Sequence, residues 1–386
     1  MAHPGRRRTR GRLASLAALT LTASLITATA SGNTASPAKE LSCGFGPRPL
    51  PAQPAQPDEE FWELFEQYGP GWTGADSTYS VLLPDGRTAW LFSDTFLGAV
   101  NPDRSRPDDG VHLVNNSIVV QDGDELTTLV GGTLDEPESL FIPTDGSSWY
   151  WVYDGVVEDD ELQIFLIKFT RFGDGMWDWE WSGTDVATLS LPDLEIQEFV
   201  PLEVDNGIQY GAYVLPHRDY TYIYGIEDRG VPKLGHVARA PRGEVLAQDE
   251  WEYFTGSGWS ADPAATAPFL GDSIANEYSV TPMRGGYVLI TLDTSVPLDE
   301  WRDVVAYYSC SPEGPWTKRT VIYEAPEADD PELWPYNAHA HPQFTKNGQL
   351  LISYNVNTTD FFSLWDDADR YRARFIRADL PGVWRH

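Results

Sequence analysis

Residues 79–94 read YSVLLPDGRTAWLFSD, an alternating apolar segment followed by a Pro-Asp-Gly-Arg turn and a second segment with aromatic residues. Pro, Asp and Gly favour tight turns, and apolar alternation on both sides of a turn is typical of paired strands. The stretch therefore predicts a β-hairpin. Two aspartates frame it: Asp76 lies just before the first strand, and Asp94 ends the second.

The same unit occurs four more times along the chain. Its copies lie at residues 138–154, 210–228, 278–293 and 341–357. The five turns centre on Gly86, Gly146, Asp219, Gly286 and Gly348, with spacings of 60 to 73 residues. Each hairpin is followed by more strand-like sequence with its own turn, so one repeat amounts to about four strands.

Radial repeats of about four strands build a β-propeller. The sequence therefore predicts an all-β fold, a five-bladed β-propeller over residues 58–386. The fifth repeat ends one strand short at His386, and we expect an N-terminal segment, either 41–45 or the one just after Asp58, to close the ring. A pair of β-sandwiches is the alternative, but it does not explain the regular spacing.

The N-terminus has a different composition from the rest. Five arginines precede an apolar run, 13–26, and the small-residue segment Ala28-Thr29-Ala30, so we interpret residues 1–30 as a secretory signal peptide. The run is too short for stable membrane insertion. We expect a secreted protein, exported by the Sec route or, because of its paired arginines, by the Tat route. Residues 31–57 read as a Pro/Ala-rich linker, and a short helix capped by Asp58 follows.

Two cysteines bear on the compartment. In an exported protein Cys43 and Cys310 favour a disulfide, and each has only the other as partner. Two free thiols are the alternative. A lipid on Cys43 is a further one, disfavoured because Glu40 stands where lipoprotein signals usually have Leu.

The charge excludes several partner classes. The formal net charge is −31, and it becomes −36 without residues 1–30, which carry five arginines and no acid. Such a surface repels phosphate backbones and anionic lipids, so nucleic acid is excluded as a partner. Neutral or cationic ligands remain compatible. We expect a monomer.

The first strand of each propeller blade lines the central channel, so polar residues at the start of these strands converge on one mouth. They are Asp76, Glu138, Gln209, Asn276 with Glu277, and His339 with His341. Carboxylates that face one another suggest glycoside hydrolysis, in which one acid is protonated and the other ionised. The candidate catalytic residues are Asp76, Asp94, Glu138 and Glu277. The plainer interpretation is polar strand ends in water, since Asp154, Asp228 and Asp293 close other predicted hairpins much as Asp94 closes the first.

Further residues are candidates for substrate binding rather than catalysis. They are Trp72, Gln209, Asn276, His339, His341 and Asn355. The two histidines have a spacing of two, so on a strand both side chains point the same way. No third ligand for zinc is identifiable, and no cofactor fingerprint occurs. We expect no cofactor, and a structural channel cation such as calcium stays open.

Several motifs, in order, resemble a known family. They are DSTYSVLLPDGRTAWLFSDTFLG, NNSIVVQ, EYSVTPMRGGYVLIT, SPEGPWT and NAHAHPQF with LLISYNVN. The chain resembles the secreted domain-of-unknown-function family 4185, which overlaps glycoside hydrolase family 183, the endo-D-arabinanases of mycobacterial-type cell walls. The resemblance implies a five-bladed propeller, hydrolysis of a furanoside polysaccharide, and an acidic pair at Asp76 and Asp94. A non-catalytic glycan-binding propeller and a cell-surface scaffold for a protein partner are the alternative functions.

Overall fold

The computed structural model describes residues 55–380, except 176–177, 272–273, 284 and 318. All of them belong to one compact unit, Ser42–His386. The described part of the chain forms 27 strands and only two short α-helices, α1 (Glu59–Phe65) and α2 (Ser363–Asp366). Neither helix is long and apolar enough to cross a membrane. The all-β prediction is therefore confirmed.

Five antiparallel sheets carry most of the strands. Sheet one is β3 (Tyr79–Leu82), β4 (Thr88–Phe92), β7 (Ser117–Asp122) and β8 (Glu125–Leu129). Sheet two is β11 (Ser148–Glu158), β12 (Glu161–Arg171), β13 (Trp179–Ser190) and β14 (Ile196–Pro201). Sheet three is β15 (Gln209–His217), β16 (Tyr220–Asp228), β17 (Lys233–Pro241), β18 (Glu252–Phe254), β19 (Trp259–Ser260) and β20 (Leu270–Gly271).

The remaining strands complete two large and two small sheets. Sheet four is β21 (Tyr278–Met283), β22 (Gly286–Leu292), β23 (Asp303–Ser309) and β24 (Thr320–Glu324). Sheet five is β25 (Leu333–Lys346), β26 (Gln349–Thr358), β27 (Arg374–Asp379) and β1 (Gln56–Pro57). The small sheets are β2 (Trp72–Ala75) with β5 (Thr95–Leu97) and β6 (His112–Val114), and β9 (Gly131–Gly132) with β10 (Pro137–Glu138).

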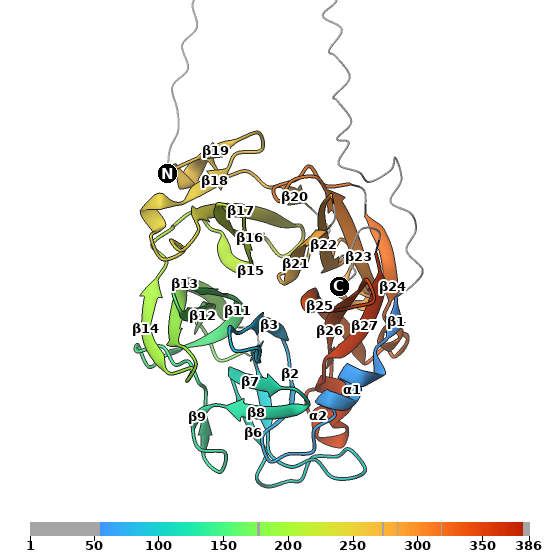
Figure 1. The fold of residues 1–386 in the computed structure, drawn as a ribbon. Coiled ribbons are helices and arrows are strands. Elements are labelled where there is room, and N and C mark those ends of the chain that lie inside the picture. The colour runs from blue at the N-terminus through green and yellow to red at the C-terminus, as the bar shows by residue number, and fades with distance from the viewer. Residues whose placement is uncertain (1–54, 176–177, 272–273, 284, 318, 381–386) are drawn as a thin grey trace, which may run out of the picture. The chain divides into compact units, whose positions relative to one another are not determined.

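The first strands of the five large sheets form a ring of contacts. Strand β3 contacts β11, β11 contacts β15, β15 contacts β21, β21 contacts β25, and β25 contacts β3. Figure 1 shows these strands nearest a common centre, with the later strands of each sheet farther out. The hydrogen-bonded ladders themselves stay within each sheet.

Four of the five predicted hairpins are confirmed. They are β3–β4, β15–β16, β21–β22 and β25–β26. The second is wrong, because residues 138–154 do not pair as a hairpin. The inner strand there is β11, whose partner is β12. Their turn is Asp159-Asp160, and both residues have positive φ, 51° and 64°, as a tight two-residue hairpin turn requires.

The outer strand of sheet five does come from the N-terminal side. The strand Gln56–Pro57 pairs with β27, so it lies at the end of the predicted linker, just before Asp58 rather than just after it. The predicted helix follows as α1, and the Asp58 carboxylate accepts a hydrogen bond from the Phe61 amide at 2.8 Å. Asp58 also pairs with Arg377 on β27, which ties this segment to sheet five.

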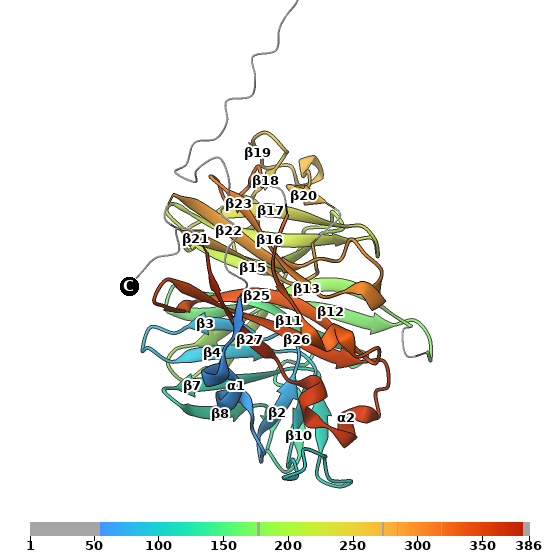
Figure 2. The same ribbon diagram turned by 90° about the vertical axis from the view of Figure 1, so that its right-hand side faces the viewer.

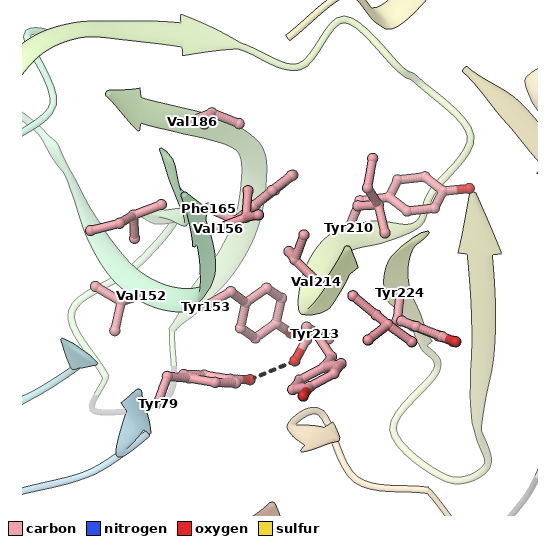
Figure 3. Packing of buried hydrophobic residues seen from close by; sticks show 14 of the residues in the cluster. Tyr79, Val152, Tyr153, Val156, Phe165, Val186, Tyr210, Tyr213, Val214 and Tyr224 are labelled. Atoms are coloured by element: carbon pink, nitrogen blue, oxygen red, sulfur yellow. Dashed lines mark hydrogen bonds between the residues drawn. The ribbon is translucent and has the colours of Figure 1, made fainter. Parts of the chain in front are cut away.

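Buried tyrosines join the inner strands. The Tyr79 hydroxyl on β3 donates to the Ala212 carbonyl on β15 at 2.9 Å, and its ring packs edge-on against Tyr153 of β11 at 6.3 Å. Figure 3 shows Tyr79, Tyr153 and Tyr213 side by side in this core. The start of β3, and with it the loop that carries Asp76, is thereby fixed against sheets two and three.

Candidate active site

The loop Asp76-Ser77-Thr78 connects β2 to β3 and has an unusual backbone. Ser77 and Thr78 have φ angles of +68° and +65°, a left-handed conformation that is costly for a β-branched residue such as Thr. The surroundings hold it in place. Asn355 donates to the Thr78 hydroxyl at 2.9 Å, and His339 Nε2 donates to the Thr78 carbonyl at 2.9 Å. This conformation directs Asp76 toward the inner ends of the other sheets.

The Asp76 carboxylate is held by two tyrosines. The hydroxyls of Tyr336 and Tyr371 donate to its Oδ2 at 3.2 and 3.0 Å. Although the residue as a whole is half-buried, its Oδ1 is inaccessible to solvent and has no hydrogen-bond partner among the described residues. Burial, and then the charge of Asp94, raise the pKa of Asp76 to about 8, against the lowering effect of the tyrosines. Asp76 is therefore mostly protonated at neutral pH.

Asp94 lies directly beside Asp76, between β4 and β5. The Asp76 amide donates to the Asp94 carbonyl at 3.4 Å. The Asp94 Oδ1 accepts hydrogen bonds from Trp151 Nε1 at 2.8 Å and from Asn115 Nδ2 at 3.2 Å. Burial raises the pKa of Asp94, and these two N–H donors oppose the rise because they stabilise the charged form.

Glu277 brings a third carboxylate from the start of β21. Its Oε1 accepts from the Ser77 hydroxyl at 2.9 Å and from Asn337 Nδ2 at 2.8 Å. Its Oε2 is buried without a hydrogen bond from any described residue, 3.9 Å from His339 Nδ1. Burial, and then the charge of Asp76, raise the pKa of Glu277 well above its usual range. Asp76, Asp94 and Glu277 are called the carboxylate cluster below.

Both predicted histidines lie on β25 in the interior. His339 stacks on the Tyr79 ring at 4.4 Å, and burial lowers its pKa to about 4. His341 lies between Ser80 at 2.6 Å and Ser353 at 2.8 Å, and burial lowers its pKa as well. Both rings are therefore neutral at pH 7. In the part of the chain that the structure describes, no group of three or more His, Cys, Asp or Glu side chains could hold a metal ion.

Three of the predicted polar residues lie around the cluster. Gln209 accepts from the Tyr153 hydroxyl at 3.2 Å, and the charge of Glu277 contributes to the raised pKa of Tyr153, which places this pair near Glu277. Asn276 donates to Asp228 at 2.8 Å. Asn355 is fully buried and donates a hydrogen bond to the Ala75 carbonyl, next to the Asp76 loop. It therefore positions the loop and cannot contact substrate.

Two predicted site residues are placed elsewhere. Glu138 lies exposed on β10, because the inner strand of sheet two begins ten residues later, at Ser148. No described hydrogen bond or ion pair joins it to the carboxylate cluster. Trp72 is 2% exposed and packs against Phe65 and Phe92 at 5.3 and 5.2 Å, so its ring belongs to the core and cannot stack on a ligand. The predicted Cys43–Cys310 disulfide stays a prediction, since Cys43 lies outside the described residues.

Other residues that contact the cluster are not among the predicted catalytic and binding residues, although the sequence already places Tyr336 close to the two histidines. Tyr336, Tyr371, Trp151, Asn115 and Asn337 all contact the carboxylate cluster. Asp154 was predicted to close the second hairpin. It lies instead at a bulge of the inner strand β11. Asp154 borders an open pocket of about 230 Å³ that residues of β3, β11, β15 and β25 line, and burial raises the pKa of Asp154 to about 7.

The fold and the cluster together define an all-β protein with a buried carboxylate site between its inner strands. The chain belongs to the family of the domain of unknown function DUF5005, whose model matches residues 58–379. The resemblance to family 4185 stays a prediction. No curated protein sequence matches the chain significantly.

A solved structure has a similar fold. A Bacteroides ovatus protein named as a candidate hydrolase superposes with a TM-score of 0.69 at 22% identity, covering 84% of this chain and 90% of that protein. Glycoside hydrolases are among the more distant structural neighbours. The GH43_1 enzyme of Xanthomonas citri, complexed with xylotriose, has a TM-score of 0.45 at 15% identity over 84% of this chain and 88% of its own. The Podospora anserina α-L-arabinofuranosidase has a TM-score of 0.46 at 11% identity over 81% and 93%.

Proposed function

We propose that this protein is a secreted glycoside hydrolase whose five sheets are the blades of a five-bladed β-propeller. The observation that carries the proposal is the carboxylate cluster. Two of its acids, Asp76 and Glu277, lie at the entries of inner strands, and Asp94 lies at a neighbouring strand end. One oxygen each of Asp76 and Glu277 is buried without a hydrogen bond from any described residue. Buried carboxyl groups with separated pKa values are what general acid catalysis at a glycosidic bond requires.

The surroundings of each acid suggest its role. Asp94 ionises first, because two N–H groups stabilise the charge on its Oδ1 and this charge in turn raises the pKa of Asp76, so Asp94 would act as nucleophile or as base for water. Asp76 would be the general acid. Its Oδ2 is occupied by two hydroxyl donors, so its proton belongs on Oδ1, and a pKa of about 8 keeps that proton in place at neutral pH.

Glu277 would bind substrate as a neutral acid. With its pKa raised by burial, its unpaired Oε2 carries a proton that can be donated to a sugar hydroxyl. The neutral His339 nearby adds no positive charge that would lower the pKa of Glu277.

The proposed substrate is a neutral furanoside polysaccharide, with endo-cleavage of cell-wall D-arabinan as the specific case. Three points support it: the resemblance of the motifs around Asp76 and Asp94, the strongly acidic composition that disfavours polyanions, and a predicted export signal at residues 1–30. The Bacteroides ovatus protein of the same fold is itself named as a candidate hydrolase.

A non-catalytic glycan-binding propeller is the second candidate. One observation favours it: the pKa of every acid in the cluster is raised, so a protein with all three protonated would bind sugar hydroxyls without an ionised nucleophile.

Incubation with a panel of cell-wall glycans, including D-arabinan, followed by chromatography of the products, separates the two candidates. We expect release of oligosaccharides from one glycan, and loss of that release in Asp76→Asn and Asp94→Asn. Asp219→Asn, in the exposed turn of β15–β16, is the matched control. Retention of a glycan on an affinity gel without any product would instead support the binding protein.

A further inference from the structure

Sheet two is longer than its neighbour at one end. Its strands β11, β12 and β13 have 11, 11 and 12 residues, whereas β3 and β4 of sheet one have 4 and 5. In Figure 2 β12 extends toward the right-hand side of the molecule, the side on which α2 lies. The extension therefore has no equally long strand of sheet one to cover it.

The extension carries an unusual number of indole rings on one face. Trp149 on β11 pairs with Phe169 on β12, which pairs with Trp181 on β13. Because side chains alternate along a strand, Trp151 and Trp179, two residues away from their neighbours, lie on this same face. The face defined by Trp149, Trp151, Phe169, Trp179 and Trp181 is called the aromatic face below.

Four of its five rings, those of Trp149, Trp151, Phe169 and Trp179, contact one another. Trp151 lies 4.7 Å from Phe169 and 5.1 Å from Trp179, between ring centroids. Trp149 lies 6.0 Å from Phe169 in a stacked arrangement. Phe169 is 6% exposed and forms the buried base, whereas all four tryptophans keep part of their surface exposed. A patch of half-exposed indoles on a fixed base is a preformed binding surface.

The aromatic face is continuous with the carboxylate cluster. The Trp151 indole N–H donates to Asp94 Oδ1 at 2.8 Å, so the ring that begins the face also holds the acid. At the other side the Arg171 guanidinium lies 5.6 Å from the Trp149 ring centroid, and the next residue, Phe172, is 64% exposed. The face thus runs from the cluster toward solvent.

We propose that the aromatic face binds a neutral sugar ring of the same glycan chain, next to the sugar at the carboxylate cluster. Sugar rings present apolar C–H faces that pack on flat aromatic rings, and Arg171 offers N–H donors to their hydroxyls. An anionic sugar is disfavoured by the net charge of −31. This inference rests on the proposed function. A second sugar-binding subsite strengthens binding of a glycan that extends past the cleaved bond, so it favours cleavage at internal bonds of the glycan.

The test measures binding separately from catalysis. Asp76→Asn provides a background without turnover, in which calorimetry measures the affinity for linear D-arabinan, L-arabinan and galactan oligosaccharides of six sugars. In that background we expect Trp149→Ala and Trp179→Ala each to weaken binding by ~10-fold or more. Trp149→Phe and Trp179→Phe, which keep a flat ring, restore most of the affinity. Trp259→Ala on β19 of sheet three is the matched control and leaves it unchanged.

Activity gives a second readout. In the enzyme with an intact cluster, Trp149→Ala lowers kcat/KM on the polysaccharide but leaves hydrolysis of a one-sugar aryl glycoside near wild type. Unchanged oligosaccharide affinity in both alanine variants, while the Asp76→Asn background still binds, would overturn this inference alone. If that background binds none of the oligosaccharides and the wild type releases no product, the inference and the proposed function fail together.

Discussion

Asp76→Asn should remove a pH-dependent loss of stability. Burial raises the pKa of Asp76 from 3.8 to about 8 in the folded protein. Between these two pH values the native state holds a proton that the unfolded chain releases, so the free energy of unfolding decreases as pH rises through this window. The contribution of the Asp76 proton to the free energy of unfolding is lost completely only above pH 8. Asparagine does not titrate, so the variant does not show this loss.

The magnitude follows from the width of the window. An interval from 3.8 to about 8 corresponds to ~6 kcal/mol for a fully buried group. Because solvent reaches part of the residue, we expect about half, ~3 kcal/mol. The substitution also leaves an amide N–H without an acceptor where Oδ1 was, which costs ~1–3 kcal/mol at every pH. The variant is then less stable than wild type at pH 5 and of equal or greater stability at pH 9.

Urea unfolding at pH 5, 6, 7, 8 and 9 measures this directly. The quantity of interest is the difference in free energy of unfolding, variant minus wild type, which should rise by ~2 kcal/mol across the series, since the series begins at pH 5 and the window begins at pH 3.8. For Asp219→Asn, an exposed turn residue, the same difference should stay flat. A flat difference for Asp76→Asn as well would refute the claim that Asp76 is held protonated.

Three further predictions concern single residues. Tyr371→Phe removes a hydrogen bond that lowers the pKa of Asp76, so the basic limb of the pH dependence of kcat/KM should move up by ~1 pH unit; an unmoved limb would exclude Asp76 as the acid it reports. Asp58→Ala removes the cap of α1 and the pairing with Arg377, and should lower the free energy of unfolding by ~1–2 kcal/mol in urea titrations without changing activity. Glu138→Gln should leave product release at the wild-type level, and a large loss would restore Glu138 to the site.

Turn chemistry and alternation explain what the sequence predicted of the fold. The Gly86, Gly286 and Gly348 turns mark real hairpins because their residues suit tight turns and the flanking segments alternate. The prediction of the second hairpin, residues 138–154, was wrong because it relied on the same turn chemistry. Its Thr-Asp-Gly segment at 144–146 reads as a stronger turn than Asp159-Asp160, yet it precedes the inner strand instead of closing a hairpin. Because the turn was assigned to the wrong residues, the prediction selected Glu138 as the site residue of sheet two, when the inner strand of that sheet is β11.

The carboxylates of the candidate site were predictable because they lie next to the ends of predicted strands. Asp76 and Glu277 were found because each precedes an inner strand, and Asp94 because it follows the second strand of the first hairpin, whereas His339 lies in the middle of β25 and not at its start. Tyr371 could not be found, because it contacts Asp76 across 295 positions from a short 3₁₀ helix, Ala368–Tyr371, that belongs to no repeat. Such a contact depends on how sheet five packs against β2, and no local pattern records that packing.

The reducing ends released from a cleaved glycan by wild type and by Asp94→Asn, at equal concentration and pH 6, test the central claim most directly. If Asp94 is the ionised carboxylate of a glycosidase, the variant should lose activity by ~100-fold or more while its unfolding curve still shows a cooperative transition. Wild-type rates in a folded Asp94→Asn protein would contradict the assignment of catalysis to the carboxylate cluster.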